Sequence, residues 1–74
     1  MEIKDYITSL NLKGLQGNDI AEILGVSVSM VSAYKGGSYN PSLAVAKRMY
    51  KKETIVFHPY SEEALKKEIA KDRR

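Results

Sequence analysis

The chain has 74 residues, an apolar fraction of 43% and a net charge of +3, which together describe one small domain with a modest core. It holds no cysteine, which excludes disulfides, thiolate catalysis and cysteine-ligated zinc. No apolar run is long enough to span a bilayer and charges at Glu2, Lys4 and Asp5 exclude a signal peptide, so we expect a cytoplasmic protein without a membrane partner.

Two short helices are expected at the start of the chain, each closed by a glycine. Apolar residues recur at spacings of three and four in residues 2 to 11, which predicts a first amphipathic helix. Gly14 ends it, because glycine takes the left-handed conformation at little cost. The same reasoning predicts a second helix over residues 16 to 24 that stops at Gly25.

Two further helices are expected, each preceded by a serine. Ser27 can cap a third helix to about Lys35 by accepting a hydrogen bond from a backbone N–H in the first turn. Gly36-Gly37 ends that helix, and a loop follows because the residue before a proline is pushed out of the helical region. Ser42 then caps a fourth helix to about Lys52. The inward residues are expected to be Ile20, Leu24, Val26, Val31 and Tyr34 in the second and third helices, and Leu43, Ala46, Met49 and Tyr50 in the fourth.

The last part of the chain predicts a short extended segment followed by a fifth helix. Residues 54 to 58 begin with β-branched and aromatic side chains, which favour extended backbone, and Pro59 bars continuation. Ser61 can cap the helix, with Tyr60 placed to pack on Leu65 as a hydrophobic staple. The charged residues that suit the helix dipole are Glu62 and Glu63 at its start and Lys71, Arg73 and Arg74 at its end.

One strand alone is not stable, so residues 53 to 74 have two possible roles. They either pack back on the bundle or pair with the same segment of a second chain. The second arrangement would give a two-fold homodimer. The sequence leaves both arrangements open.

Gly25, between the second and third helices, points to a helix-turn-helix. A steep crossing of two helices needs a residue with positive φ in the turn, which costs a residue other than glycine about 1–2 kcal/mol. Ala21 supplies a small side chain where the two helices approach most closely. The expected fold is all-α, a compact bundle of four to five helices whose residues 1 to 52 form a DNA-binding domain.

The stretch KGLQGNDIAEILGVSVSMVSAYKGG combines lysine-glycine-leucine, an apolar-alanine pair, glycine-valine-serine and an apolar residue six positions past that glycine. NPSLAVAKRM adds a proline-serine-leucine opening of the fourth helix. In these residues the chain resembles the Cro and phage-repressor type of helix-turn-helix domain, also called the xenobiotic response element family. The resemblance covers residues 2 to 52. It implies a transcriptional regulator of phage or prokaryotic type whose third helix, about residues 27 to 35, enters the major groove of double-stranded DNA.

Carried over by position, the resemblance implies two groups of DNA contacts. The base-edge contacts are Val28, Ser29, Ser32 and Ala33. The phosphate contacts are Gln16 and Asn18 at the start of the second helix, Ser27 at the start of the third, and Lys35, Ser38, Tyr39 and Asn40 around the following loop. The N–H groups at helix N-termini attract phosphate, which agrees with this assignment.

The chain departs from the family pattern at two places. Gly17 stands where the family usually has a glutamine at the first position of its second helix. The base-edge residues include no Arg, Gln or Asn, the types that make bidentate base contacts worth about 1–3 kcal/mol of discrimination each. We therefore expect each base contact to be weak and phosphate contacts to dominate the affinity.

Charge placement favours a polyanionic partner. No acidic residue lies between Glu22 and Glu53, whereas several cations do. We expect Lys35 on the DNA side, with Lys47 or Lys51 as further phosphate contacts. The cations of this stretch are Lys35, Lys47, Arg48, Lys51 and Lys52.

A second possible function is an interaction module that binds a repressor or another transcription protein and modulates it. The third helix presents Val28, Met30 and Ala33 among serines, and such uncharged, partly apolar side chains suit a protein contact. The apolar residues after Glu53 offer a second protein contact surface. Catalysis and metal binding lack their residue types, since His58 is the only histidine and no cysteine accompanies it. We expect a protein that is not an enzyme and needs no cofactor.

Overall fold

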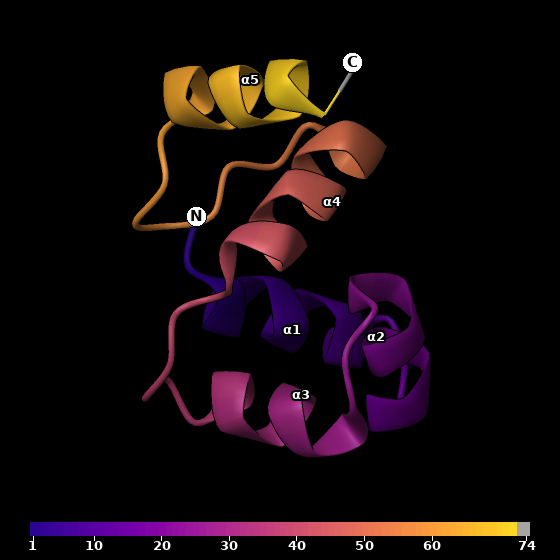
Figure 1. Ribbon diagram of the computed structural model, residues 1–74. Helices are drawn as coiled ribbons and strands as arrows, with labels where there is room; N and C mark the ends of the chain where they lie inside the picture. The colour runs from indigo at the N-terminus through magenta and orange to yellow at the C-terminus, as the bar shows by residue number, and fades with distance from the viewer. Residues whose placement is uncertain (73–74) are drawn as a thin grey trace.

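The computed structural model describes residues 1–72, and within that range it consists of five α-helices without a strand (Figure 1). The helices occupy the stretches that the sequence predicts, so the all-α expectation is confirmed. Their bounds are α1 (Ile3–Leu12), α2 (Gly17–Leu24), α3 (Val28–Lys35), α4 (Leu43–Glu53) and α5 (Glu62–Lys71). The dipole role expected for Arg73 and Arg74 falls outside the described residues.

Capping serines begin three of these helices, as the sequence predicts. Ser27 Oγ accepts a hydrogen bond from the Met30 N–H at 3.2 Å, and Ser42 does the same for Val45 at 3.3 Å. Ser61 Oγ accepts from the Ala64 N–H at 3.2 Å. Each bond satisfies a backbone donor that would otherwise have no partner in the first turn of the helix.

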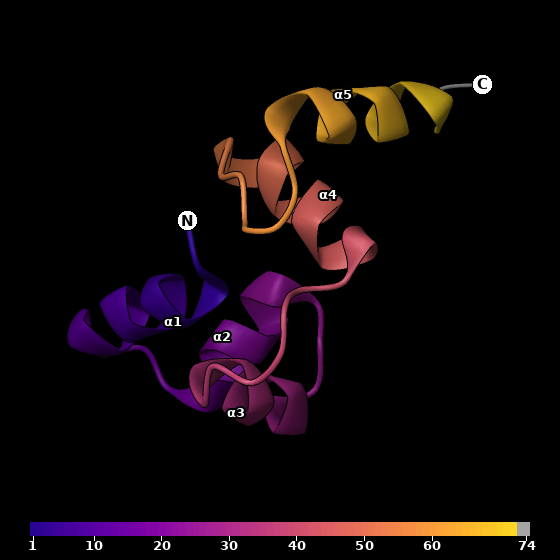
Figure 2. The same ribbon diagram turned by 90° about the vertical axis from the view of Figure 1, so that its left-hand side faces the viewer.

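The helices are arranged with α3 at one end of the molecule and α5 at the other (Figures 1 and 2). α3 packs against both α1 and α2, whereas α5 packs on α4. α4 lies between the two ends and joins them. None of the helices within residues 1–72 has the length and apolarity needed to cross a membrane.

One apolar cluster fills the space between α1, α2, α3 and α4. Four of the five inward residues expected from α2 and α3 are buried, and Val26 is half-buried. In α4 Ala46 and Met49 are buried as expected and Tyr50 is half-buried. The expectation for Leu43 is wrong, since its side chain is 38% exposed and Val45 is buried instead. The cluster comprises Ile3, Tyr6, Ile7, Leu10, Ile20, Ala21, Leu24, Val31, Tyr34, Val45, Met49 and Phe57.

The segment between α4 and α5 folds back onto the start of the chain. Phe57 is fully buried, and its ring meets that of Tyr6 edge-on with 5.5 Å between centroids. The Met1 ammonium donates to the Val56 carbonyl at 3.0 Å, and the His58 N–H donates to the Met1 carbonyl at 2.8 Å. These two bonds do not extend into a strand pair, so the expected extended segment lacks β-ladder structure.

Candidate nucleic-acid interface

The turn between α2 and α3 depends on Gly25. Its φ is 72°, the left-handed value expected for a turn glycine. A second constraint is visible only in the structure, because a Cβ atom added at Gly25 would lie 3.2 Å from Nε of Arg48. That guanidinium crosses from α4 and donates through Nε to the Ile23 carbonyl at 3.1 Å, near the end of α2. Arg48 therefore stabilises the helix end with a positive charge and holds the turn against α4.

α3 has one buried side and one exposed side. Val31 and Tyr34 are 4% and 1% exposed and anchor the helix in the core. Ser29 and Ser32 lie on the exposed side, and within residues 1–72 neither hydroxyl is hydrogen-bonded to another protein group. By contrast, the hydroxyl of Thr8 on α1 already has a partner, since it donates to the Lys4 carbonyl. The hydroxyls of α3 are thus available to an external partner.

A groove brings the start of α2 next to the exposed side of α3. Gln16 and Gly17 line it together with Ser32 and Lys35, and residues of α1 complete its wall. A Cβ atom added at Gly17 would lie 3.6 Å from Cγ1 of Val28, an ordinary van der Waals contact, so the start of α2 lies beside the start of α3. Residues that the sequence assigned to phosphates and to bases therefore share one surface.

The N-terminus of α2 already has an anionic partner. Asp19 accepts a hydrogen bond from the Gln16 N–H at 3.0 Å through Oδ2. A carboxylate at this position satisfies the helix N-terminus and competes with a phosphate for it. Gln16 and Asn18 are exposed, but the assignment of phosphate to the amides of this helix end meets a negative charge that sequence reasoning did not weigh.

The loop after α3 is exposed and has a cation beside it. Ser38, Tyr39 and Asn40 are all exposed, and Gly37 has a φ of 81°. A Cβ atom added at Gly37 would lie 3.2 Å from Cδ of Lys4, so α1 places a lysine next to this loop. Sequence reasoning missed Lys4 because it lies more than thirty positions away along the chain, in a different helix.

The eleven residues expected to contact DNA differ little in exposure. Ala33 is half-buried, and the other ten are exposed. The exposed fractions of Val28 and Met30 are 45% and 37%, so the start of α3 also presents apolar surface. The exposed members are Gln16, Asn18, Ser27, Val28, Ser29, Ser32, Lys35, Ser38, Tyr39 and Asn40.

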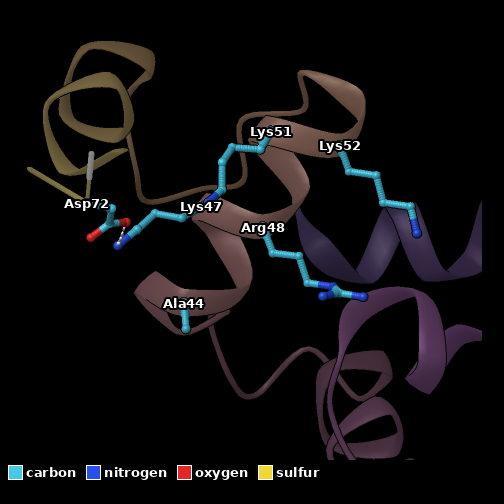
Figure 3. A pocket seen from close by; sticks show the side chains of 6 residues that line it. All are labelled: Ala44, Lys47, Arg48, Lys51, Lys52 and Asp72. Carbon is cyan, nitrogen blue, oxygen red and sulfur yellow. Dashed lines mark ion pairs between the residues drawn. The ribbon is translucent and has the colours of Figure 1, made fainter. Parts of the chain in front are cut away.

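The cations of α4 do not join this surface, although the same acid-free stretch of sequence contains them. Figure 3 shows Lys47 directed to the end of α5, where its Nζ lies 2.6 Å from Oδ2 of Asp72. The hydrogen bond from Lys47 lowers the pKa of the Asp72 carboxyl, and the nearby charge of Lys51 acts in the same direction. Lys47 is thus already paired with a carboxylate, on the side of α4 that faces α5.

Comparisons of this chain with protein-family models, with curated proteins and with solved structures returned no match.

Proposed function

We propose that this protein is a small cytoplasmic DNA-binding transcriptional regulator in which α2 and α3 form a helix-turn-helix. The observation that carries the proposal is the exposed side of α3, where uncharged hydrogen-bonding side chains lie opposite the buried anchors Val31 and Tyr34. α3 has eight residues and is about 12 Å long at 1.5 Å per residue. The major groove is about 12 Å wide, and it admits a helix because the diameter of a helix with its side chains is about 10–12 Å.

The side chains of α3 suit base edges rather than a charged ligand. Ser29 and Ser32 can donate to or accept from several bases, and Val28 and Ala33 can contact a thymine methyl. None of these residues makes a bidentate contact, so discrimination per base pair is small. Binding therefore depends on several weak contacts made by a helix in a fixed orientation.

Phosphate contacts supply the larger part of the affinity in this proposal. Lys35 at the end of α3 and Lys4 beside Gly37 place two cations next to the exposed loop. Backbone amides of the loop add uncharged donors. Such contacts position the protein on the duplex without reading its sequence.

A selection from random duplexes followed by salt titration tests the proposal. We expect a preferred sequence, and an affinity whose log–log dependence on salt has a slope near −0.9 per phosphate contacted. Measuring molecular mass free and bound decides between one chain and a homodimer. The absence of binding to every duplex at low salt would remove the proposal.

A pair of matched variants connects the affinity to α3. Ser32→Glu puts a carboxylate on the exposed side of α3, and we expect it to abolish selective binding. Ala70→Glu makes the same change of charge on α5, at the other end of the molecule, and should leave the preferred sequence unchanged. Equal loss in both variants would mean that net charge, and not α3, governs binding.

A second candidate is supported by the apolar surface of Val28 and Met30, since such residues are typical of a protein contact. In this case α3 binds a repressor or another transcription protein. Val28→Glu would then abolish capture of that partner while affinity for DNA stays negligible. A DNA affinity that depends on Ser32 favours the first candidate.

A further inference from the structure

α4 carries a basic groove that the proposed function leaves unused. The groove is wide open to solvent and has a volume of about 590 Å³ between α4 and the end of α5 (Figure 3). Its lining includes a single carboxylate, that of Asp72, and four cations from α4. The lining residues are Ala44, Lys47, Arg48, Lys51, Lys52 and Asp72.

Asp72 occupies this groove as an anion would. Its carboxylate is 2.6 Å from the Lys47 ammonium and is the acceptor of that contact. Lys51 and Lys52 are exposed, and α4 has no acidic residue before Glu53. An anion that displaced the carboxylate would meet Lys47 and Lys51, whereas Figure 3 shows Lys52 directed to the other side of α4.

The groove adjoins the turn that precedes α3. Arg48 lines it and also donates to the Ile23 carbonyl, and the same side chain lies against Gly25. Arg48 therefore connects the groove to the turn between α2 and α3.

We infer that the α4 groove is a second binding surface for DNA backbone phosphates, and that Asp72 competes with those phosphates for Lys47. The inference rests on the proposed function and deepens it, because it means that the carboxylate at the end of α5 lowers the affinity for DNA. Displacement exchanges one ion pair for another and breaks no covalent bond.

The spacing of the cations favours a row of phosphates over a single anion. Lys47 and Lys51 are four residues apart, which places them on one face of the helix about 6 Å apart along its axis. Successive phosphates of one strand are about 3.4 Å apart along the axis of B-DNA, so the row can meet at least two of them. Lysine binds phosphate as a point charge, which tolerates such an approximate match.

The first test removes the competing carboxylate. Asp72→Asn frees Lys47, so we expect tighter binding to a random duplex and a salt slope steeper by about 0.9, the value for one additional phosphate. Glu63→Gln makes the same change in net charge on an exposed residue of α5 outside the groove, and should produce less than half of that change in slope. Equal slopes in the two variants, or weaker binding in Asp72→Asn, would overturn the inference.

The second test removes cations of the groove. Lys51→Gln with Lys52→Gln should make the slope shallower by about 0.9 for each phosphate that the groove no longer binds. Lys66→Gln with Lys67→Gln is the control, with the same change of charge on exposed residues of α5. An indistinguishable pair of double variants would remove the groove from the interface.

The two tests separate the inference from the proposal beneath it. If the unmodified chain binds DNA through Ser32 but the groove variants match their controls, the inference fails and the proposed function stands. If the chain binds no duplex at any salt concentration, both fail.

Discussion

The α2–α3 corner and the α4–α5 end are held together by different forces. At the corner, Leu24, Val31 and Tyr34 are almost fully buried within the main apolar cluster. At the other end, α5 buries Leu65 outside that cluster, and Figure 2 shows the helix projecting away from the body formed by α1, α2 and α3.

Polar contacts complete the α4–α5 end. The Tyr50 hydroxyl donates to Oε2 of Glu62 at 3.1 Å, and the Lys47–Asp72 pair closes the other end of α5. Exposed charge pairs weaken as salt is added, whereas apolar burial hardly depends on salt. We therefore expect added salt to weaken the contacts of α5 more than the packing of α3.

The greatest loss of stability should come from a change in the core of the corner. Leu24→Ala deletes a fully buried side chain and should lower the free energy of unfolding by about 2–5 kcal/mol. Urea denaturation measures the loss. Leu65→Ala is the matched change at the other end, and hydrogen exchange should show α5 opening while α1, α2 and α3 stay protected. A cooperative loss of the whole fold in Leu65→Ala would contradict the division into two regions.

The second largest loss of stability should come from a change at the turn glycine, Gly25. Gly25→Ala forces a side chain into the left-handed region and against Arg48, and should cost about 2 kcal/mol of stability. Gly14→Ala is its control, because Gly14 has a φ of 93° but no atom within 4 Å of an added Cβ. Thermal or urea unfolding should show a larger loss for Gly25→Ala. Equal losses would assign the whole cost to backbone strain and none to Arg48.

A smaller loss is expected from Tyr6, which links α1 to α4. Its hydroxyl donates to Oε2 of Glu53 at 2.9 Å, and Tyr6→Phe should cost about 1.5 kcal/mol, the lower end for a bond to a charged group because Glu53 is exposed. Burial, together with this bond, raises the pKa of Tyr6 to about 12 from an ordinary value of 10.0.

The pKa of Tyr6 sets the sign of its pH dependence. The folded chain holds the phenol proton more tightly than the unfolded chain, so the contribution is fully present below pH 10 and is lost as the pH rises towards about 12. Unfolding experiments across that window should show a steeper fall for the unmodified chain than for Tyr6→Phe. Parallel curves would show that folding does not raise the pKa of Tyr6.

The mildest of these changes should be a gain in stability. Gly36 ends α3 with a right-handed φ of −69°, and an added Cβ meets only ordinary contacts. Gly36→Ala should therefore raise stability by about 0.4–1 kcal/mol by restricting the unfolded chain. Gly37→Ala, at a φ of 81° and against Lys4, should lower it. Urea denaturation of both variants measures the difference, and a loss in both would place the end of α3 differently.

Much of the local structure could be predicted from residues close together in the chain. Ser27, Ser42 and Ser61 cap the helices they precede, and Gly25 has the positive φ that its position requires. Leu43 was an exception, because helical spacing alone does not decide which side of a first turn faces the core. Along α4 the buried side begins at Val45.

The candidate surface could be predicted only in part. The exposed side of α3 follows from the burial of Val31 and Tyr34, which the apolar pattern indicates. The distribution of charge does not follow from sequence, because cations that are neighbours in the chain point in different directions around α4. Lys47 pairs with Asp72, and Arg48 caps α2.

The five helices, their caps and the turn at Gly25 follow from the amino-acid sequence alone, since each depends on residues within about four positions of one another. Which charges share a surface depends on how the helices pack. Arg48 reaches a carbonyl 25 positions away, Lys4 lies against Gly37, and Asp72 closes the α4 groove. Those contacts join separate helices, and no local spacing rule encodes the packing of one helix on another.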